Sequence, residues 1–262
     1  LLDHQNYSYA AAQKAIDALI LKGVPLIFNT SKTQIESILL SKALGLSHPV
    51  IIENGGGIVI PTQYDFTTPS NKYDWDHGTE VIPLGANIEE IRDVLLRAGS
   101  TLPAACDFRT FSSMSVEQIQ ALTGLAMDDA ANAKQRQFSE PLEWLGDQEG
   151  LEQFELFLKA HKLNLIAGGR FYHVLGESNK CTAMVHLAAM YENSADNNAE
   201  ALIVALGDSK NDREMLAGAD IAVVVKNSAG TGLSIDHKDL IYTNKEGPQG
   251  WQEAIEQILP RL

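Results

Sequence analysis

Short apolar runs alternate along the chain with segments whose apolar residues recur at helical spacing. Helical spacing covers residues 9–21 and 34–44, and uninterrupted apolar runs stand at 24–28 and 50–52. Such runs are typical of strands that are buried on both faces of a parallel sheet, whereas a sheet with one wet face would show alternation. The order helix, strand, helix, strand therefore predicts an α/β fold in which helices flank a parallel sheet.

A polar cluster follows another apolar run, at residues 201–206. The run ends at Gly207, and Asp208, Asn211 and Asp212 come within the next five positions. Open α/β sheets bind their ligands at the carboxyl ends of their strands. An Asx turn or a helix cap would also use Asp and Asn here. We favour a magnesium site formed by Asp208 and Asp212, because a buried carboxylate needs a partner and hard oxygen ligands suit Mg²⁺.

Thr30, Ser31 and Lys32 occupy the same kind of position, just after the apolar run at 24–28. Hydroxyl groups and the first amides of the next helix can hold a phosphate at such a place. Either hydroxyl could instead only cap the helix that follows. Because a second polar cluster begins at another strand end, at Asp208, phosphate binding is the better interpretation.

Lys180 begins a further predicted helix, over residues 180–191. A lysine at a helix N-terminus opposes the helix dipole, so its side chain either is solvated or reaches an anion. The helix pattern alone leaves both interpretations open.

Three consecutive glycines at 55–57 follow Glu53 and Asn54. The spacing G-x-G-x-x-G of dinucleotide-binding turns is absent, and residues 58–60 have the composition of a strand, not of a helix. We therefore predict a tight hairpin at these glycines.

Residues 80–173 have the pattern of a separate α+β unit. Its predicted strands are at 81–84, 163–166 and 171–175, and its predicted helices are at 87–96, 115–124 and 151–161. We predict that residues 80–173 form a domain inserted into a core made of residues 1–79 and 174–262. After a last core strand at 221–225, the chain is expected to be a polar C-terminal region.

Composition narrows the range of partners. The 262 residues carry a formal net charge of −14, which argues against nucleic acid and anionic membrane surfaces. A small anionic substrate remains possible, because the field inside a cleft is local.

No apolar run approaches the length of a transmembrane helix. Cys106 and Cys181 are too few for a disulfide framework and fit a reducing cytoplasm. The sequence gives no indication of oligomeric state.

Six segments, spread over nearly the whole chain, match a known pattern. They are N-T-S-K-T at 29–33, I-E-N-G-G at 52–56, Q-F-S-E-P at 137–141, G-R-F-Y-H-V at 169–174, G-D-S-K-N-D at 207–212 and E-G-P-Q-G-W at 246–251. The chain resembles the haloacid dehalogenase-like (HAD) phosphatases with a type C2 cap, and most closely the mannosyl-3-phosphoglycerate phosphatases among them. The resemblance implies a Rossmann-like core with an inserted α+β cap. It also implies an enzyme that transfers the phosphoryl group of a small anionic sugar phosphate to an aspartate beside Mg²⁺.

The resemblance further implies roles for single residues. Asp208 and Asp212 would hold Mg²⁺, and Asn211 would orient their loop. Thr30 and Lys180 would stabilise the phosphoryl oxygens. The residues implied in substrate binding are Ser31, Lys32, Glu53, Asn54, Gly55, Arg136, Glu140, Arg170 and His173. Among these, the two arginines suit a carboxylate or a second anion, and the histidine and the glutamate of the cap suit sugar hydroxyls.

The family's D-x-D-G-T motif, which supplies the nucleophile and the general acid, is not in this sequence. The segment Leu1-Leu2-Asp3 resembles the residues that follow such a motif, so we expect both aspartates and their strand upstream of Leu1. A protein without them would be a non-catalytic sugar-phosphate-binding protein. A HAD phosphatase for another small sugar phosphate is a further alternative, because residue types do not fix the stereochemistry of the sugar.

Overall fold

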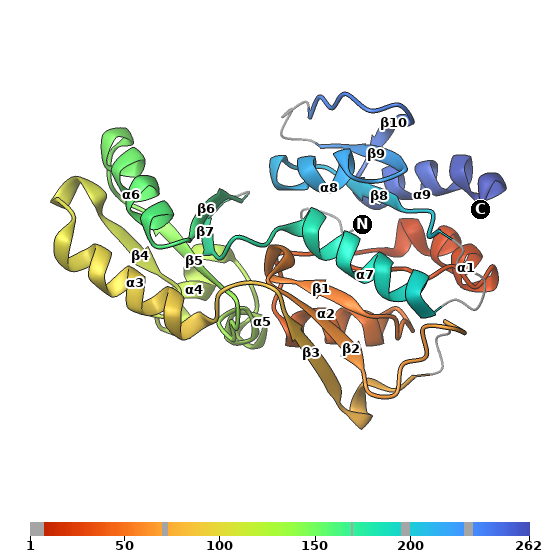
Figure 1. Ribbon diagram of the computed structural model, residues 1–262, viewed down its shortest axis with the longest axis horizontal. Coiled ribbons are helices and arrows are strands. Elements are labelled where there is room, and N and C mark those ends of the chain that lie inside the picture. The colour runs from red at the N-terminus through yellow and green to blue at the C-terminus, as the bar shows by residue number, and fades with distance from the viewer. Residues whose placement is uncertain (1–7, 70–72, 169, 195–199, 228–232) are drawn as a thin grey trace.

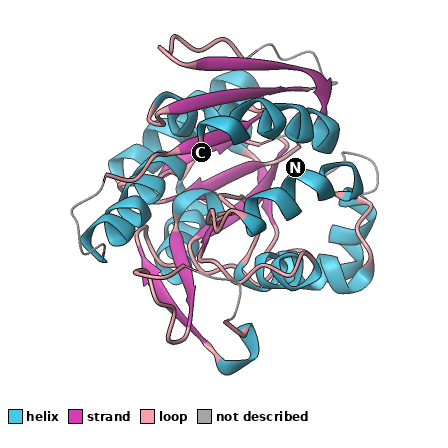
Figure 2. Cartoon of the chain, turned by 90° about the vertical axis from the view of Figure 1, so that its right-hand side faces the viewer, coloured by secondary structure: helices cyan, strands magenta, loops and turns pink. Residues whose placement is uncertain are grey.

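A computed structural model describes residues 8–69, 73–168, 170–194, 200–227 and 233–262. Leu1–Asp3 and Gly169, which carry parts of the expected motifs, lie outside the described residues. The chain forms a core and a cap that lie side by side (Figure 1), and helices flank the strands of the core (Figure 2). Within the described ranges, no helix is both long enough and apolar enough to cross a bilayer.

The core contains a parallel sheet with the order β10-β9-β8 and an antiparallel sheet with the order β1-β2-β3. The strands are β1 (Val50–Ile52), β2 (Gly57–Pro61), β3 (Thr79–Pro83), β8 (Val204–Gly207), β9 (Ile221–Lys226) and β10 (Leu240–Glu246). The helices are α1 (Gln13–Leu21), α2 (Gln34–Ala43), α7 (Lys180–Ser194), α8 (Arg213–Ala217) and α9 (Gly247–Ile258). Short 3-10 helices span Ala10–Ala12, Glu53–Gly55, Trp75–His77, Ala104–Cys106, Lys210–Asp212 and Leu259–Arg261. The predicted α/β fold with a parallel sheet and flanking helices is confirmed.

The predicted strand at 24–28 has no regular secondary structure, and the chain bridges to β1 only at the next residue, Asn29. The Ile51 N–H donates to the Phe28 carbonyl at 2.7 Å, and the Thr30 N–H donates to the Ile51 carbonyl at 3.0 Å. This single parallel bridge is not a ladder. The prediction of a regular strand is therefore wrong for residues 24–27, because among the described residues no strand pairs with them.

The C-terminal region is also different from the expectation of a polar segment after residue 226. β10 pairs in parallel with β9, and the apolar side of α9 is buried. Pro248 in the first turn of α9 and the spacing of Trp251, Ala254, Ile255 and Ile258 are helix signals. The expectation was wrong because β10 is the edge of its sheet, where exposed side chains make a strand look like a loop.

The cap is an antiparallel sheet with the order β4-β5-β7-β6, covered by helices. Its strands are β4 (Phe108–Thr110), β5 (Ser139–Trp144), β6 (Asn164–Ala167) and β7 (Tyr172–Leu175), and its helices are α3 (Ile88–Thr101), α4 (Val116–Thr123), α5 (Met127–Ala133) and α6 (Gln148–Ala160). Phe154, Leu142 and Val174 are fully buried in a hydrophobic cluster of its own. β3 (Thr79–Pro83) pairs with β2 of the core, although the predicted boundary places most of β3 in the cap. The domain boundaries at 79/80 and 173/174 stay a prediction.

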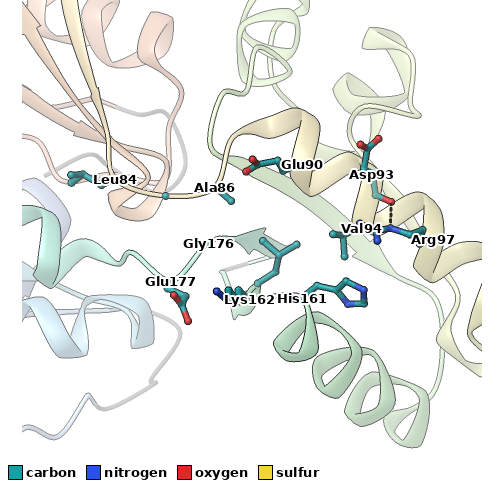
Figure 3. A pocket seen from close by; sticks show the side chains of 12 residues that line it. Leu84, Ala86, Glu90, Asp93, Val94, Arg97, His161, Lys162, Gly176 and Glu177 are labelled. Atoms are coloured by element: carbon teal, nitrogen blue, oxygen red, sulfur yellow. Dashed lines mark hydrogen bonds between the residues drawn. The ribbon is translucent and has the colours of Figure 1, made fainter.

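Two linkers, at residues 84–86 and 176–179, connect the core with the cap and lie against each other. A Cβ on Gly176 would be 2.5 Å from the backbone nitrogen of Ala86, so only glycine fits there. A cavity of about 490 Å³ lies between the linkers, α3 and the turn at Lys162 (Figure 3). Charged side chains of both signs line it, and none of the predicted site residues does.

We expect Phe154→Ala to lower the free energy of unfolding of the protein by about 3–5 kcal/mol, because it removes a buried aromatic ring and leaves a cavity. Phe154 is 0% exposed and packs against the rings of Phe108 and Trp144. The matched control is Leu156→Ala on the same helix, since Leu156 is 68% exposed. Denaturant unfolding measures both variants, and equal losses would contradict the assignment of this cluster as the core of the cap.

Candidate active site

The loop after β8 is folded around the carboxylate of Asp212. Its Oδ2 accepts the N–H groups of Asp208 and Ser209, each at 3.1 Å, and the hydroxyl of Ser209 at 2.8 Å. Gly207 leaves room for this arrangement, because a Cβ there would lie 2.5 Å from the Cβ of Asp212. The side-chain amide of Asn227, after β9, donates to Asp208 Oδ2 at 3.3 Å. The loop therefore uses the Asp212 carboxylate for its own structure and holds the Asp208 carboxylate beside the end of β9.

Lys180 and Asp212 form a buried ion pair. Lys180 Nζ lies 2.6 Å from Asp212 Oδ1, and the two residues are 8% and 5% exposed. Burial raises the pKa of the Asp212 carboxyl, but the Lys180 ammonium outweighs burial, so that the pKa lies below its ordinary value. The side-chain amide of Asn29 donates to the Lys180 carbonyl at 2.8 Å and fixes the start of α7. The lysine at this helix start thus reaches an anion, which is Asp212.

The predicted glycine hairpin is confirmed, and its turn joins separate parts of the site. The N–H of Glu53 donates to the Lys32 carbonyl at 3.0 Å, and the N–H of Asn54 donates to the Thr30 carbonyl at 2.8 Å. On the other side of the turn, Asn211 Nδ2 donates a hydrogen bond to Asn54 Oδ1 at 3.2 Å. The turn therefore connects the loop at Thr30 with the loop after β8.

Gly55 packs the same turn against the start of α7. Its φ is +94°, and a Cβ would lie 2.1 Å from the Asn179 carbonyl oxygen, so no other residue fits. The neighbouring Glu53 is fully buried and directs its carboxylate toward the cap strand β5. Gly55 and Glu53 therefore make packing contacts at the site, and the contacts of Glu53 join the core to the cap.

A cavity of about 840 Å³ opens between these elements. Its apolar part lies between residues 24–28 and β8, and side chains of α7 and α9 contribute to its wall. The predicted site residues that line it are Thr30, Ser31, Lys32, His173, Lys180, Asp208, Asn211 and Asp212. The fold thus brings side chains from distant parts of the sequence to one cavity at the carboxyl end of β8, where α/β proteins bind ligands.

His173, on β7, faces this cavity from the cap. Burial, together with the positive charges of Arg136 and Lys180, lowers the pKa of His173 to about 3. The imidazole is therefore neutral at physiological pH. Its Nδ1 is buried and has no hydrogen-bond partner among the described residues. Because buried polar atoms in proteins are nearly always hydrogen-bonded, this nitrogen is available to a ligand.

Three other predicted cap residues contact protein groups and do not line the cavity. Arg136 Nη1 donates to the carbonyl of Ser31 at 2.6 Å, which brings the guanidinium next to the site. Arg170 is exposed, and its Nη1 donates to the carbonyl of Thr123 at 2.7 Å. Glu140 is fully buried and accepts a backbone N–H within the cap. The structure thus brings Arg136 close to residues 30–32, where phosphate binding is predicted and which are called the phosphate loop below. It leaves Arg170 and Glu140 hydrogen-bonded within the cap.

Among the described residues that line the cavity, Asp208 and Asp212 carry the carboxylates, which are oxygen donors of the kind that could hold a cation. In the described part of the chain, no three His, Cys, Asp or Glu side chains are grouped to hold a metal.

Asn227 is a site residue that sequence reasoning missed. It directly follows β9, as Asp208 follows β8, so the same inspection of strand ends would have found it.

Comparisons with known proteins agree on one family. The family described as haloacid dehalogenase-like hydrolase matches residues 124–247. A protein of Persephonella marina, named glucosyl-3-phosphoglycerate/mannosyl-3-phosphoglycerate phosphatase, is 33% identical over 100% of this chain and 94% of its own length. A protein of the same name from Methanococcoides burtonii is 33% identical over 99% of this chain and 93% of its own.

The fold also has counterparts among solved structures. A haloacid dehalogenase-like hydrolase from Bacteroides thetaiotaomicron superimposes with a TM-score of 0.62, at 16% identity, over 98% of this chain and 95% of its own. At that identity the likeness shows the fold alone.

We expect Asp212→Asn to lower the free energy of unfolding at pH 7 by about 3–5 kcal/mol, because it leaves the Lys180 charge buried without its partner. The lowered pKa of Asp212 means that its stabilisation is complete above the unfolded pKa of about 3.9 and is lost as pH falls through the folded pKa. The difference in the free energy of unfolding between the wild type and Asp212→Asn should therefore be constant from about pH 8 to 5 and shrink below about pH 4.

Denaturant unfolding across this pH range measures the difference. Asp93→Asn, at an exposed position of α3, is the control, and its effect should stay within about 0.5 kcal/mol. A difference between wild type and Asp212→Asn that stays constant down to the acid limit would contradict the charged pair.

Proposed function

Since the chain belongs to the haloacid dehalogenase-like hydrolases and is a phosphoric monoester hydrolase, we propose that it hydrolyses the phosphomonoester of mannosyl-3-phosphoglycerate or of a close glycosyl-3-phosphoglycerate. The names of both relatives, at 33% identity over nearly the full chain, support this substrate class. The observation that carries the proposal is the meeting of Thr30, Lys180 and Asp208 at the polar end of one cavity.

The phosphate would bind at the loop that begins with Thr30. The hydroxyls of Thr30 and Ser31 and the charge of Lys180 lie at the same cavity, so they can surround an anion with donors and positive charge. The equatorial oxygens of a phosphoryl group carry most of the negative charge in the transition state. Lys180 already offsets the charge of Asp212, and the same ammonium can also donate toward the phosphoryl group because it has three protons.

Asp208 and Asp212 fit Mg²⁺ as hard oxygen donors. Because both oxygens of Asp212 are already bonded to Lys180 and to the loop, Asp208 would be the direct ligand and Asp212 would act through water. Mg²⁺ usually keeps several waters and binds through one or two carboxylates plus a substrate phosphate, which suits this small donor set. When bound, the ion would supply positive charge against the phosphoryl oxygens. Asn211 would hold the loop through its bond to Asn54.

The nucleophile would be the first aspartate of the D-x-D-G-T motif that the resemblance implies, carried by an additional parallel strand. Among the described residues, β8 pairs with β9 alone, and both β8 and residues 24–28 border the apolar part of the 840 Å³ cavity. A strand between them would bring its carboxyl end beside Thr30, Lys180 and Asp208.

The reaction that we propose has two steps. The carboxylate of the first aspartate attacks phosphorus and the ester P–O bond breaks, while the second aspartate gives its proton to the leaving sugar-side oxygen. The second aspartate then takes a proton from water, which attacks phosphorus and releases phosphate from the aspartyl-phosphate. Lys180 and Thr30 hold the phosphoryl oxygens through both steps.

Specificity would come from the cap. A glycosyl-3-phosphoglycerate has a carboxylate in addition to its phosphate, and an arginine fork can bind a carboxylate with two bonds. Arg136 suits this role better than Arg170, because it touches Ser31 whereas Arg170 is bonded to the carbonyl of Thr123. The neutral His173, with its unpartnered Nδ1, would bind a hydroxyl of the substrate.

We expect Asp208→Ala to lower phosphatase activity of the full-length protein by more than about a hundredfold, because a bound metal supplies several kcal/mol of transition-state stabilisation. Excess EDTA should abolish wild-type activity, and added Mg²⁺ should restore it. Lys210→Ala, at an exposed position of the same loop, is the control and should keep its activity. Normal turnover by Asp208→Ala, or full activity of the wild type in excess EDTA, would contradict the magnesium proposal.

We expect Arg136→Ala to lower kcat/KM for mannosyl-3-phosphoglycerate about ten- to a hundredfold, the cost of a lost charged hydrogen bond. Hydrolysis of p-nitrophenyl phosphate, which has no carboxylate, should fall much less. Arg170→Ala is the matched comparison. A larger loss in Arg170→Ala would assign the carboxylate to Arg170, and equal losses on both substrates would mean that Arg136 supports the phosphate loop.

A further inference from the structure

A fully buried carboxylate of the core binds the first residues of a cap strand. Glu53 is 0% exposed. Its Oε1 accepts the N–H of Gln137 at 2.9 Å, and its Oε2 accepts the N–H of Phe138 at 3.1 Å and the hydroxyl of Ser139 at 2.7 Å. Ser139 is the first residue of β5, and Gln137 and Phe138 directly precede it, so the charge of Glu53 is satisfied by hydrogen bonds from the cap.

The backbone of the same residue is held by the core. Glu53 and Asn54 have φ of 50° and 59°, a region that residues other than glycine rarely adopt unless their surroundings impose it. Their N–H groups donate to the carbonyls of Lys32 and Thr30 in the phosphate loop. Glu53 therefore binds the phosphate loop with its backbone and the cap with its side chain.

These contacts depend on where the cap lies. A buried carboxylate without hydrogen bonds is strongly unfavourable, and the three donors are available only while β5 starts beside the turn. If the cap moved away, Glu53 would exchange all three for water. Hydrogen bonds to a charged acceptor are about twice as strong as neutral ones, so Glu53 favours the observed cap position over any opened one.

We infer that Glu53 is a positioning residue that couples the cap to the phosphate loop. Arg136 directly precedes Gln137, and its guanidinium donates to the Ser31 carbonyl. By fixing the N–H groups of Gln137 and Phe138, Glu53 sets where Arg136 stands relative to the phosphate loop. The role of Arg136 toward substrate rests on the proposed function, whereas the coupling of cap and loop does not.

Amide hydrogen exchange of Glu53→Gln tests the coupling directly. Glutamine keeps the shape of the side chain, but its NH₂ group cannot accept a hydrogen bond and no charge remains. We expect protection of the Gln137 and Phe138 amides to fall about tenfold or more. The Phe111 amide, which donates to Pro141 within the cap at 2.9 Å, should keep its protection.

Two further variants make the result specific. Ser139→Ala removes one of the three donors and leaves the carboxylate, so it should lower the same protection by a smaller factor. Glu143→Gln, a change to the carboxylate that pairs with Arg109 at the other end of β5, is the control and should change neither amide. Ser139→Ala also serves as the test if Glu53→Gln does not fold.

Activity gives a second measurement. We expect Glu53→Gln to raise KM for mannosyl-3-phosphoglycerate about tenfold with a smaller change in kcat, because the cap is less often in place when substrate binds. Unchanged protection of Gln137 and Phe138 in both variants would overturn the inference. Equal loss of protection at Phe111 would also overturn it, since Glu53 would then stabilise the folding of the cap. If the exchange results hold but the wild type does not hydrolyse this substrate, the proposed function fails and the coupling stands.

Discussion

An ammonium and a carboxylate buried together hold the candidate site in one arrangement. Lys180 starts α7, Asp212 closes the loop after β8, and their atoms lie 2.6 Å apart. Replacing a buried ion pair by apolar residues is often neutral or stabilising, so such a pair is weak evidence for a role in stability alone. Here Asp212 has a second role, because it also orders the loop that carries Asp208. The pair therefore fixes the start of α7 relative to the loop after β8, and side chains of both line the same cavity.

Much of this site could be predicted from the sequence because its residues follow strands. Asp208 and Thr30 come after apolar runs, and the ends of parallel strands meet at one edge of a sheet. This single rule brings together residues that are far apart in the chain, and the cavity contains them. The rule applies equally to Asn227 after β9, which was overlooked because a lone asparagine resembles a turn residue.

The direction of a side chain could not be predicted in the same way. Glu53 and Glu140 have the composition of binding residues, yet both are fully buried and bonded to protein groups. Arg170 was expected to suit a carboxylate or a second anion, but its guanidinium donates to the Thr123 carbonyl. Such partners come from elements distant in sequence, so no local pattern reveals them. The C-terminal strand and helix were missed for another reason, since an edge strand with exposed positions looks polar.

The glycines at 56 and 57 connect the construction of the site with the position of the cap. A Cβ on Gly56 would lie 2.4 Å from the Cβ of Phe138, and one on Gly57 would lie 2.6 Å from Cε2 of its ring. The cap can therefore approach the turn only because no side chain intervenes. This close approach is also what brings the Phe138 N–H within 3.1 Å of Glu53. Glycine is thus required for the contact between core and cap, and this contact explains glycine at positions 56 and 57 of the predicted hairpin.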